Sequence, residues 1–125
     1  MRYLATQSTV RRMVASTELL SQLRRGALEY CVLALLAETQ RYGFDLVRTL
    51  GAVDGMVTGE GTVYPLLSRL KKDGRVTTTW QDSESGPPRK YYAITADGRR
   101  ALSDFSNEWR RFRDAVDHLL AVGER

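Results

Sequence analysis

The chain has 125 residues, a length typical of one domain with a core of modest size. Its net charge of +4 and pI near 9.5 favour an anionic partner. The longest apolar run, residues 30–37, is far too short to span a bilayer. With one cysteine, Cys31, and one histidine, His118, the sequence has neither a disulfide nor the clusters that metal sites and nucleophile–base pairs need. We therefore expect that the protein is not an enzyme, that it binds no metal or cofactor, and that it is cytoplasmic.

Residues 1–20 form a basic extension with three arginines and no acid before Glu18. Two interpretations stay open for this segment. The first is an additional arm or helix, and the second is an organellar transit peptide, whose composition is similar. We favour the arm or helix, because a partial apolar face is present at Leu4, Val10, Met13 and Val14.

Two helices are predicted next. Residues 17–39 read as one long helix that is apolar nearly all round in its second half, so it should be buried in the core or against a second subunit. Residues 44–50 read as a shorter helix that Gly51 closes, with Phe44, Val47 and Leu50 pointing inward. Residues 56–58 could form a short extended piece.

The stretch GTVYPLLSRLKKDG, residues 61–74, predicts a capped helix with two faces. Val63, Leu66, Leu67 and Leu70 form an apolar stripe at helical spacing. With Thr62 as N-cap, Pro65 falls in the first turn, where proline is tolerated, and Gly74 supplies the left-handed residue that ends the helix. The opposite face carries three cations, a phenol and a hydroxyl, from Tyr64, Ser68, Arg69, Lys71 and Lys72.

A hairpin follows this helix directly. Residues 76–81 and 89–94 have the β-branched and aromatic content of strands, and residues 82–88, DSESGPP, have the composition of a turn. Two short helices followed by a strand pair match the outline of a winged helix-turn-helix, which we favour over a bare helix-turn-helix or an unrelated α+β domain. The predicted fold class is mostly α with a small β wing, and residues 21–95 form the DNA-binding domain.

The last helix is expected to begin after an N-cap at Thr95 and to continue to about residue 122. Its apolar positions alternate in steps of three and four, as in a coiled coil, and one small domain cannot cover so long a seam. We therefore interpret residues 96–125 as a dimerisation helix, with a seam of Leu102, Phe105, Trp109, Phe112, Val116 and Leu119.

The outward face of residues 61–74 suits the major groove of DNA, which accommodates one helix. Arg69 can make a bidentate contact to guanine, Tyr42 can donate to a phosphate, and Arg89 and Lys90 place two cations on the wing. The alternative is that these cations merely keep the surface hydrated, which would account for Lys71 and Lys72.

Four segments resemble the PadR transcriptional regulators, in the order and spacing of that family: RRGALEYCVLALL (24–36), YGFDLVRTL (42–50), EGTVYPLLSRLKKDG (60–74) and GPPRKYYAIT (86–95). The resemblance implies a homodimeric repressor that leaves a palindromic operator when it binds a small molecule. The single C-terminal helix is similar to the short branch of the family. Members usually begin near residue 21, so residues 1–20 have no counterpart, and ligand specificity is not shared.

The same resemblance implies roles for individual residues. In some short-branch members a tryptophan at the position of Trp109 stacks on flat aromatic ligands, and here Phe105 and Phe112 would wall the slot. Two other functions stay open: a DNA-binding architectural factor without a ligand, and a protein-interaction module. The family's DNA-contacting positions correspond to Thr62, Tyr64, Pro65, Ser68 and Arg69, supported by Tyr42, Arg89 and Lys90.

Overall fold

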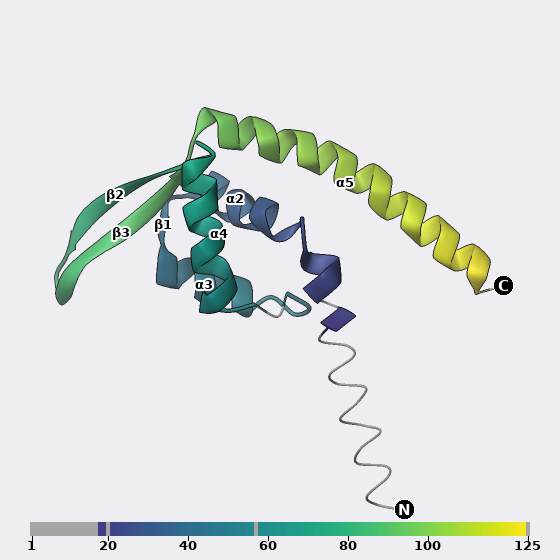
Figure 1. Cartoon of the computed structure of the whole chain (residues 1–125), viewed down its shortest axis with the longest axis horizontal. Helices are drawn as coiled ribbons and strands as arrows, with labels where there is room; N and C mark the ends of the chain where they lie inside the picture. Colours follow the sequence, from purple (N-terminus) through teal and green to yellow (C-terminus); the bar gives the residue numbers. More distant parts are fainter. Residues whose placement is uncertain (1–17, 20, 57, 125) are drawn as a thin grey trace, which may run out of the picture.

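The computed structural model describes residues 18–19, 21–56 and 58–124 (Figure 1). The basic extension predicted for residues 1–20, with its two interpretations, therefore falls outside the described residues apart from 18 and 19. The elements after it are α2 (Leu28–Glu38), β1 (Arg41–Tyr42), α3 (Gly43–Gly51), α4 (Glu60–Lys72), β2 (Val76–Ser83), β3 (Gly86–Ile94) and α5 (Ala96–Gly123). The predicted fold class is confirmed: helices dominate, with one small antiparallel sheet and a long C-terminal helix.

The single helix predicted over residues 17–39 is wrong, because the chain breaks it in two. Residues 18–19 and 21–24 are helical, residues 25–27 form a turn, and α2 begins only at Leu28. The break lies at Gly26, whose φ of 86° belongs to the left-handed region that glycine adopts without a steric penalty. The apolar pattern continues across the turn, so hydrophobic periodicity alone did not reveal it.

The core lies where α2, α3 and α4 meet the sheet. Leu33 of α2, Leu46 of α3 and Leu67 of α4 are all fully buried. Phe44 was expected to point inward but is 47% exposed. The buried positions of α3 are Gly43, Leu46 and Leu50, and Phe44 lies beside this stripe rather than within it.

Helix α4 begins three residues earlier than predicted, with Gly59 and not Thr62 at the N-cap. Pro65 therefore lies in the second turn, where it leaves the carbonyl of Gly61 without its usual helical donor. The other end agrees with the prediction. Gly74 has a φ of 76°, its N–H donates to the Lys71 carbonyl at 3.1 Å, and the N–H of Arg75 donates to the Leu70 carbonyl at 2.9 Å. This pair of bonds is a Schellman motif.

The sheet has the order β1-β3-β2, and both pairs are antiparallel. β2 and β3 pair from Val76 with Ile94 out to Ser83 with Gly86, so the turn is shorter than predicted and the wing longer. β1 was not predicted, and it places Tyr42 opposite Tyr91 in the sheet, immediately before α3. Met56 and Thr58 lie in no strand.

Helix α5 is fixed at its start and free towards its end. The Thr95 hydroxyl accepts from the Gly98 N–H at 3.1 Å, as predicted for an N-cap, and donates to the Gly74 carbonyl at 2.7 Å. Gly98 is buried against the carbonyl of Arg75, where a side chain would collide with backbone. Figure 1 shows the second half of α5 running beyond the rest of the molecule. No helix among the described residues is long and apolar enough to cross a membrane.

Candidate nucleic-acid interface and aromatic cavity

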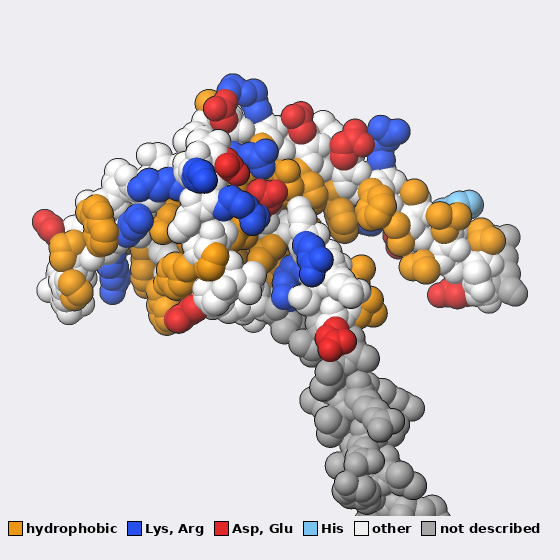
Figure 2. Space-filling model, viewed as in Figure 1, with side chains coloured by type: hydrophobic (Ala, Val, Ile, Leu, Met, Phe, Trp, Pro, Cys, Tyr) orange, Lys and Arg blue, Asp and Glu red, His pale blue; other side chains and the backbone are white. Residues whose placement is uncertain are grey.

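The two faces predicted for α4 are present. Val63, Leu66, Leu67 and Leu70 are buried in the core, which fixes the orientation of the helix. Figure 2 shows basic side chains over α4 and the neighbouring strands. The exposed side of the helix carries all the residues of this segment that we expected to meet DNA: Thr62, Tyr64, Pro65, Ser68, Arg69, Lys71 and Lys72.

On one flank of α4 the structure brings together Tyr42, Tyr64 and the cations of the wing. The guanidinium carbon of Arg89 lies 4.6 Å from the centre of the Tyr42 ring, and the Lys90 ammonium 5.6 Å from that of Tyr92. These side chains surround an open cavity of about 360 Å³. Three elements that are distant in sequence therefore present cations and phenols together. The cavity is lined by Tyr42, Gly43, Phe44, Tyr64, Arg89, Lys90 and Tyr92.

Tyr64 is held in place on this flank by close packing. A Cβ built on Gly43 would lie 2.6 Å from Cε1 of Tyr64, so any other residue there would force the ring to move. Partial burial raises the pKa of Tyr64, and the negative charge of Glu60 and then Tyr92 raise it further. The phenol therefore keeps its proton at neutral pH and can donate a hydrogen bond to a phosphate.

A second cavity lies between the turn at residues 25–27 and α5. Phe105 stacks on Tyr30 of α2, with ring centres 4.1 Å apart and an angle of 2° between the ring planes. The ring centre of Trp109 lies 6.0 Å from that of Phe105. Beside Phe105 and Trp109 is a mostly apolar cavity of about 290 Å³. Sequence reasoning identified these two aromatics but missed the rest of the lining, which consists of Leu23, Arg24, Ala27, Leu28, Cys31, Gly55 and Met56.

Two details define the chemistry of this cavity. Nη1 of Arg24 donates to the Met56 carbonyl at 2.7 Å, which ties the loop before α4 to the first helical segment. Burial raises the pKa of the Cys31 thiol, so the thiol is neutral at physiological pH. Phe112 lies on the other side of Trp109, at 6.5 Å between ring centres, and does not line the cavity.

Residues 32–104 match the family model of the PadR-like transcriptional regulators, from α2 into the first third of α5. This range covers more than half of the chain. The chain belongs to the PadR-like family. The sequence-based identification is therefore confirmed: the chain is a member of a family of transcriptional regulators.

Solved structures of PadR-like proteins have the same fold. A PadR-like transcription factor of Bacteroides fragilis is 38% identical, with a TM-score of 0.66, and the match covers 82% of this chain and 98% of that one. A PadR family regulator of Eggerthella lenta is 36% identical, with a TM-score of 0.70 and coverage of 94% and 96%. An uncharacterized protein of Lysinibacillus sphaericus is 30% identical over 102 residues, which are 80% of this chain and 94% of that protein.

In this PadR-family chain the predicted seam of α5 divides into two parts. Leu102 and Phe105 are partly buried and pack against the body of the same chain. Trp109 and Phe112 are 42% and 64% exposed, and Leu119 is 67% exposed. A dimer through this seam stays a prediction. Within the described residues no group of three or more metal-ligating side chains gathers.

Proposed function

We propose that this PadR-family protein is a homodimeric repressor that reads a palindromic operator with α4 and the wing, and that a planar aromatic molecule releases it. The observation that carries the proposal is the division of α4 into a buried apolar face and an exposed cationic face beside the wing. Such a helix presents donors to phosphates and base edges on a scaffold fixed by its other face.

The apolar seam supports the homodimer. Trp109, Phe112, Val116 and Leu119 stay exposed along the second half of α5, at positions that share one face of the helix. Exposed apolar stripes of this kind mark protein interfaces. A second copy of α5 offers the same stripe, and a two-fold axis makes such a contact self-complementary. A two-fold dimer carries two copies of α4, which suits a palindromic site.

The cavity beside Trp109 supports a flat aromatic effector. Its walls are mostly apolar, and the Phe105 and Trp109 rings offer faces for stacking. The cavity also contacts the loop before α4 through Gly55 and Met56. A ligand there would touch both the dimerisation helix and the segment that leads into the reading helix, so its binding can bias DNA affinity.

The DNA-binding part is tested by two substitutions on α4. Arg69→Ala should weaken operator binding by about 1–3 kcal/mol and relax base preference, because it removes a bidentate donor. Lys72→Ala should weaken binding to all sequences alike and reduce the salt dependence. Fluorescence anisotropy with operator and random duplexes measures both. If both variants bind like the wild type while remaining dimeric, α4 is not the reading helix.

The effector part is tested by titrating the protein with flat aromatic compounds while following tryptophan fluorescence. Trp109 should be quenched by compounds that release DNA. Trp80 on the wing is exposed and distant from the cavity lining, so Trp80→Phe and Trp109→Phe variants separate the two signals. Compounds that release DNA yet leave Trp109 unchanged, and that still act on Trp109→Ala, would place the effector elsewhere.

A further inference from the structure

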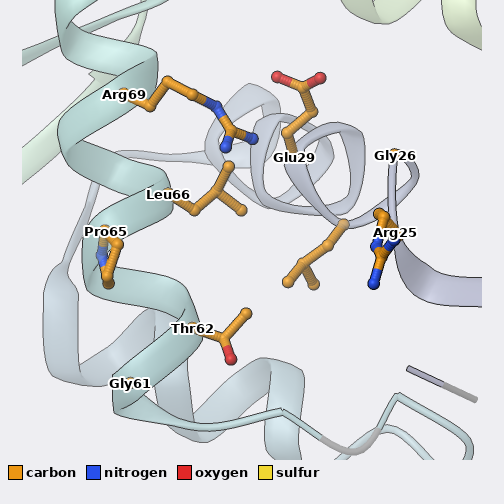
Figure 3. Close-up of a pocket in the computed structure, with 9 residues that line it drawn as sticks. Arg25, Gly26, Glu29, Gly61, Thr62, Pro65, Leu66 and Arg69 are labelled. Carbon is orange, nitrogen blue, oxygen red and sulfur yellow. The ribbon is translucent and has the colours of Figure 1, made fainter. Parts of the chain in front are cut away.

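The exposed face of α4 has two flanks, and the phosphate contacts assigned to Tyr42 and Tyr64 lie on only one of them. At about 100° per residue, Tyr64 and Arg69 lie about 140° apart around the helix, with Ser68 and Lys72 between them. Tyr64 faces the cavity that Tyr42 and Arg89 share. Arg69 faces away from it, towards the first residues of α2 (Figure 3).

On the Arg69 flank the structure has an open cleft of about 340 Å³ between α4 and the turn at residues 25–27. Figure 3 shows Thr62, Pro65 and Arg69 along one wall and Arg25 on the turn across from them. Arg25 is exposed, and the left-handed Gly26 that follows it turns the chain at this point. Two guanidinium groups from separate segments therefore border one open cleft.

The charge of this cleft is positive. Glu29 also lines it, but its carboxylate accepts from Nη1 of Arg75 at 3.3 Å and is thereby neutralised. Within the described ranges, neither Arg25 nor Arg69 forms an ion pair. Both guanidinium groups are therefore available to an anion that approaches from solvent.

A helix in the major groove has a phosphate backbone on each side. The groove is about 12 Å wide and a helix with its side chains about 10–12 Å across, so both flanks of the helix approach phosphates. We propose that Arg25, across the cleft from Thr62 and Arg69, holds the backbone of the second DNA strand there, opposite the strand held by Tyr42 and Arg89, while Arg69 reaches the base edges. This inference rests on the proposed DNA-binding function and adds Arg25, outside the helix-turn-helix, as a phosphate-positioning residue.

The first experiment measures binding against salt concentration for the full-length protein. The two DNAs are a duplex selected by the wild type from a random pool and an unrelated duplex of the same length. Arg25→Gln should reduce the slope of log K, the logarithm of the DNA association constant, against log salt concentration by about 0.9 per protomer. At 0.1 M salt this corresponds to about an eightfold loss of affinity per protomer. The loss should be equal for both DNAs, since a phosphate contact carries no sequence information.

Two matched variants isolate the contact from net charge. Arg111→Gln removes the same charge from an exposed position of α5 and should bind like the wild type. Arg25→Lys keeps the charge and should retain the slope. An unchanged slope in Arg25→Gln, or equal losses in Arg25→Gln and Arg111→Gln, overturns the inference. A wild type without salt-dependent DNA binding would instead remove the proposed function itself.

The second experiment identifies the strand by phosphate-ethylation interference on the selected duplex. In each half-site the wild type should be sensitive on both strands flanking one major groove. Arg25→Gln should lose the sensitive phosphates of one strand, and Arg89→Gln those of the other. If both variants lose phosphates on the same strand, or Arg25→Gln loses none, the cleft does not hold the second backbone.

Discussion

In the winged-helix body, residues 28–95, the apolar stripe of each helix is covered by other parts of the same chain, whereas the second half of α5 leaves its stripe in solvent. All twelve buried hydrophobic residues among those described lie between Leu28 and Tyr92. In α5, a helix of 28 residues, the one buried residue is Gly98. Both stripes have helical spacing, so spacing shows which face is apolar but not which partner covers it. The core of the body is covered within one chain, and we propose that a second copy of α5 covers the exposed stripe.

The largest expected effect comes from opening the core of the body. Leu67→Ala should cost about 2–5 kcal/mol of the free energy of unfolding, because it leaves a cavity at a fully buried position of α4. The loss should not depend on protein concentration. Leu119→Ala should destabilise the protein only where it is dimeric, so its effect should vanish on dilution. Denaturant titrations at two protein concentrations measure both, and a concentration-independent loss in Leu119→Ala would contradict the comparison.

A charge in the seam should have the next largest effect. Phe112→Glu buries a carboxylate in the predicted dimer interface and should weaken dimerisation by about 2–4 kcal/mol, while the body stays folded. Arg111→Glu, on the outer side of the same turn, is the control and should dimerise normally. Sedimentation velocity gives the dimer fraction and circular dichroism the helix content. A dimer that tolerates Phe112→Glu would show that another surface joins the subunits.

Gly43→Ala separates DNA binding from stability. The added methyl collides with the Tyr64 ring, which can turn away at the expense of its position on the DNA face. We expect operator affinity to fall by about 1–3 kcal/mol, with a much smaller change in thermal stability. Gly51→Ala, at the other end of α3, meets only an ordinary contact with the Thr58 carbonyl and serves as the control. Normal DNA binding by Gly43→Ala would exclude a role for Tyr64.

The junction between the body and α5 should give the smallest effect. Thr95→Ala removes the acceptor for the Gly98 N–H and the donor to the Gly74 carbonyl, and should cost about 1 kcal/mol of stability. Thr95→Ser retains both bonds and should be close to wild type. Thermal unfolding measures the difference. Equal stability of the alanine and serine variants would mean that the cap does not anchor α5.

The sequence predicted those parts of the fold that depend on short-range signals. The apolar stripe of α4, the glycine that ends it and the turn composition of the wing are all local, and each appears in the structure. A local signal was not always enough. Gly26 marks a left-handed turn, but the apolar pattern continues across it, so the break between the two helical segments was not predicted. The inward face of α3 was also misassigned, because spacing alone did not show that Leu46 and not Phe44 faces the core.

Features made by long-range contacts could not be predicted. β1 is two residues long and exists because it pairs with Tyr91 and Tyr92, some fifty residues later. The cavity beside Trp109 takes its lining from three separate segments, and Leu23, Cys31 and Met56 carry no shared sequence signal. The cleft at Arg25 likewise depends on how the turn at residues 25–27 packs beside α4.

The most direct test of a dimer that reads DNA with two copies of α4 is selection of duplexes from a random pool by the full-length protein. The account predicts an enriched inverted repeat, with half-sites centred about 34–36 Å apart or a multiple of that distance, because each protomer places one helix in the major groove. Enrichment of a single asymmetric site, or of no sequence, would contradict it.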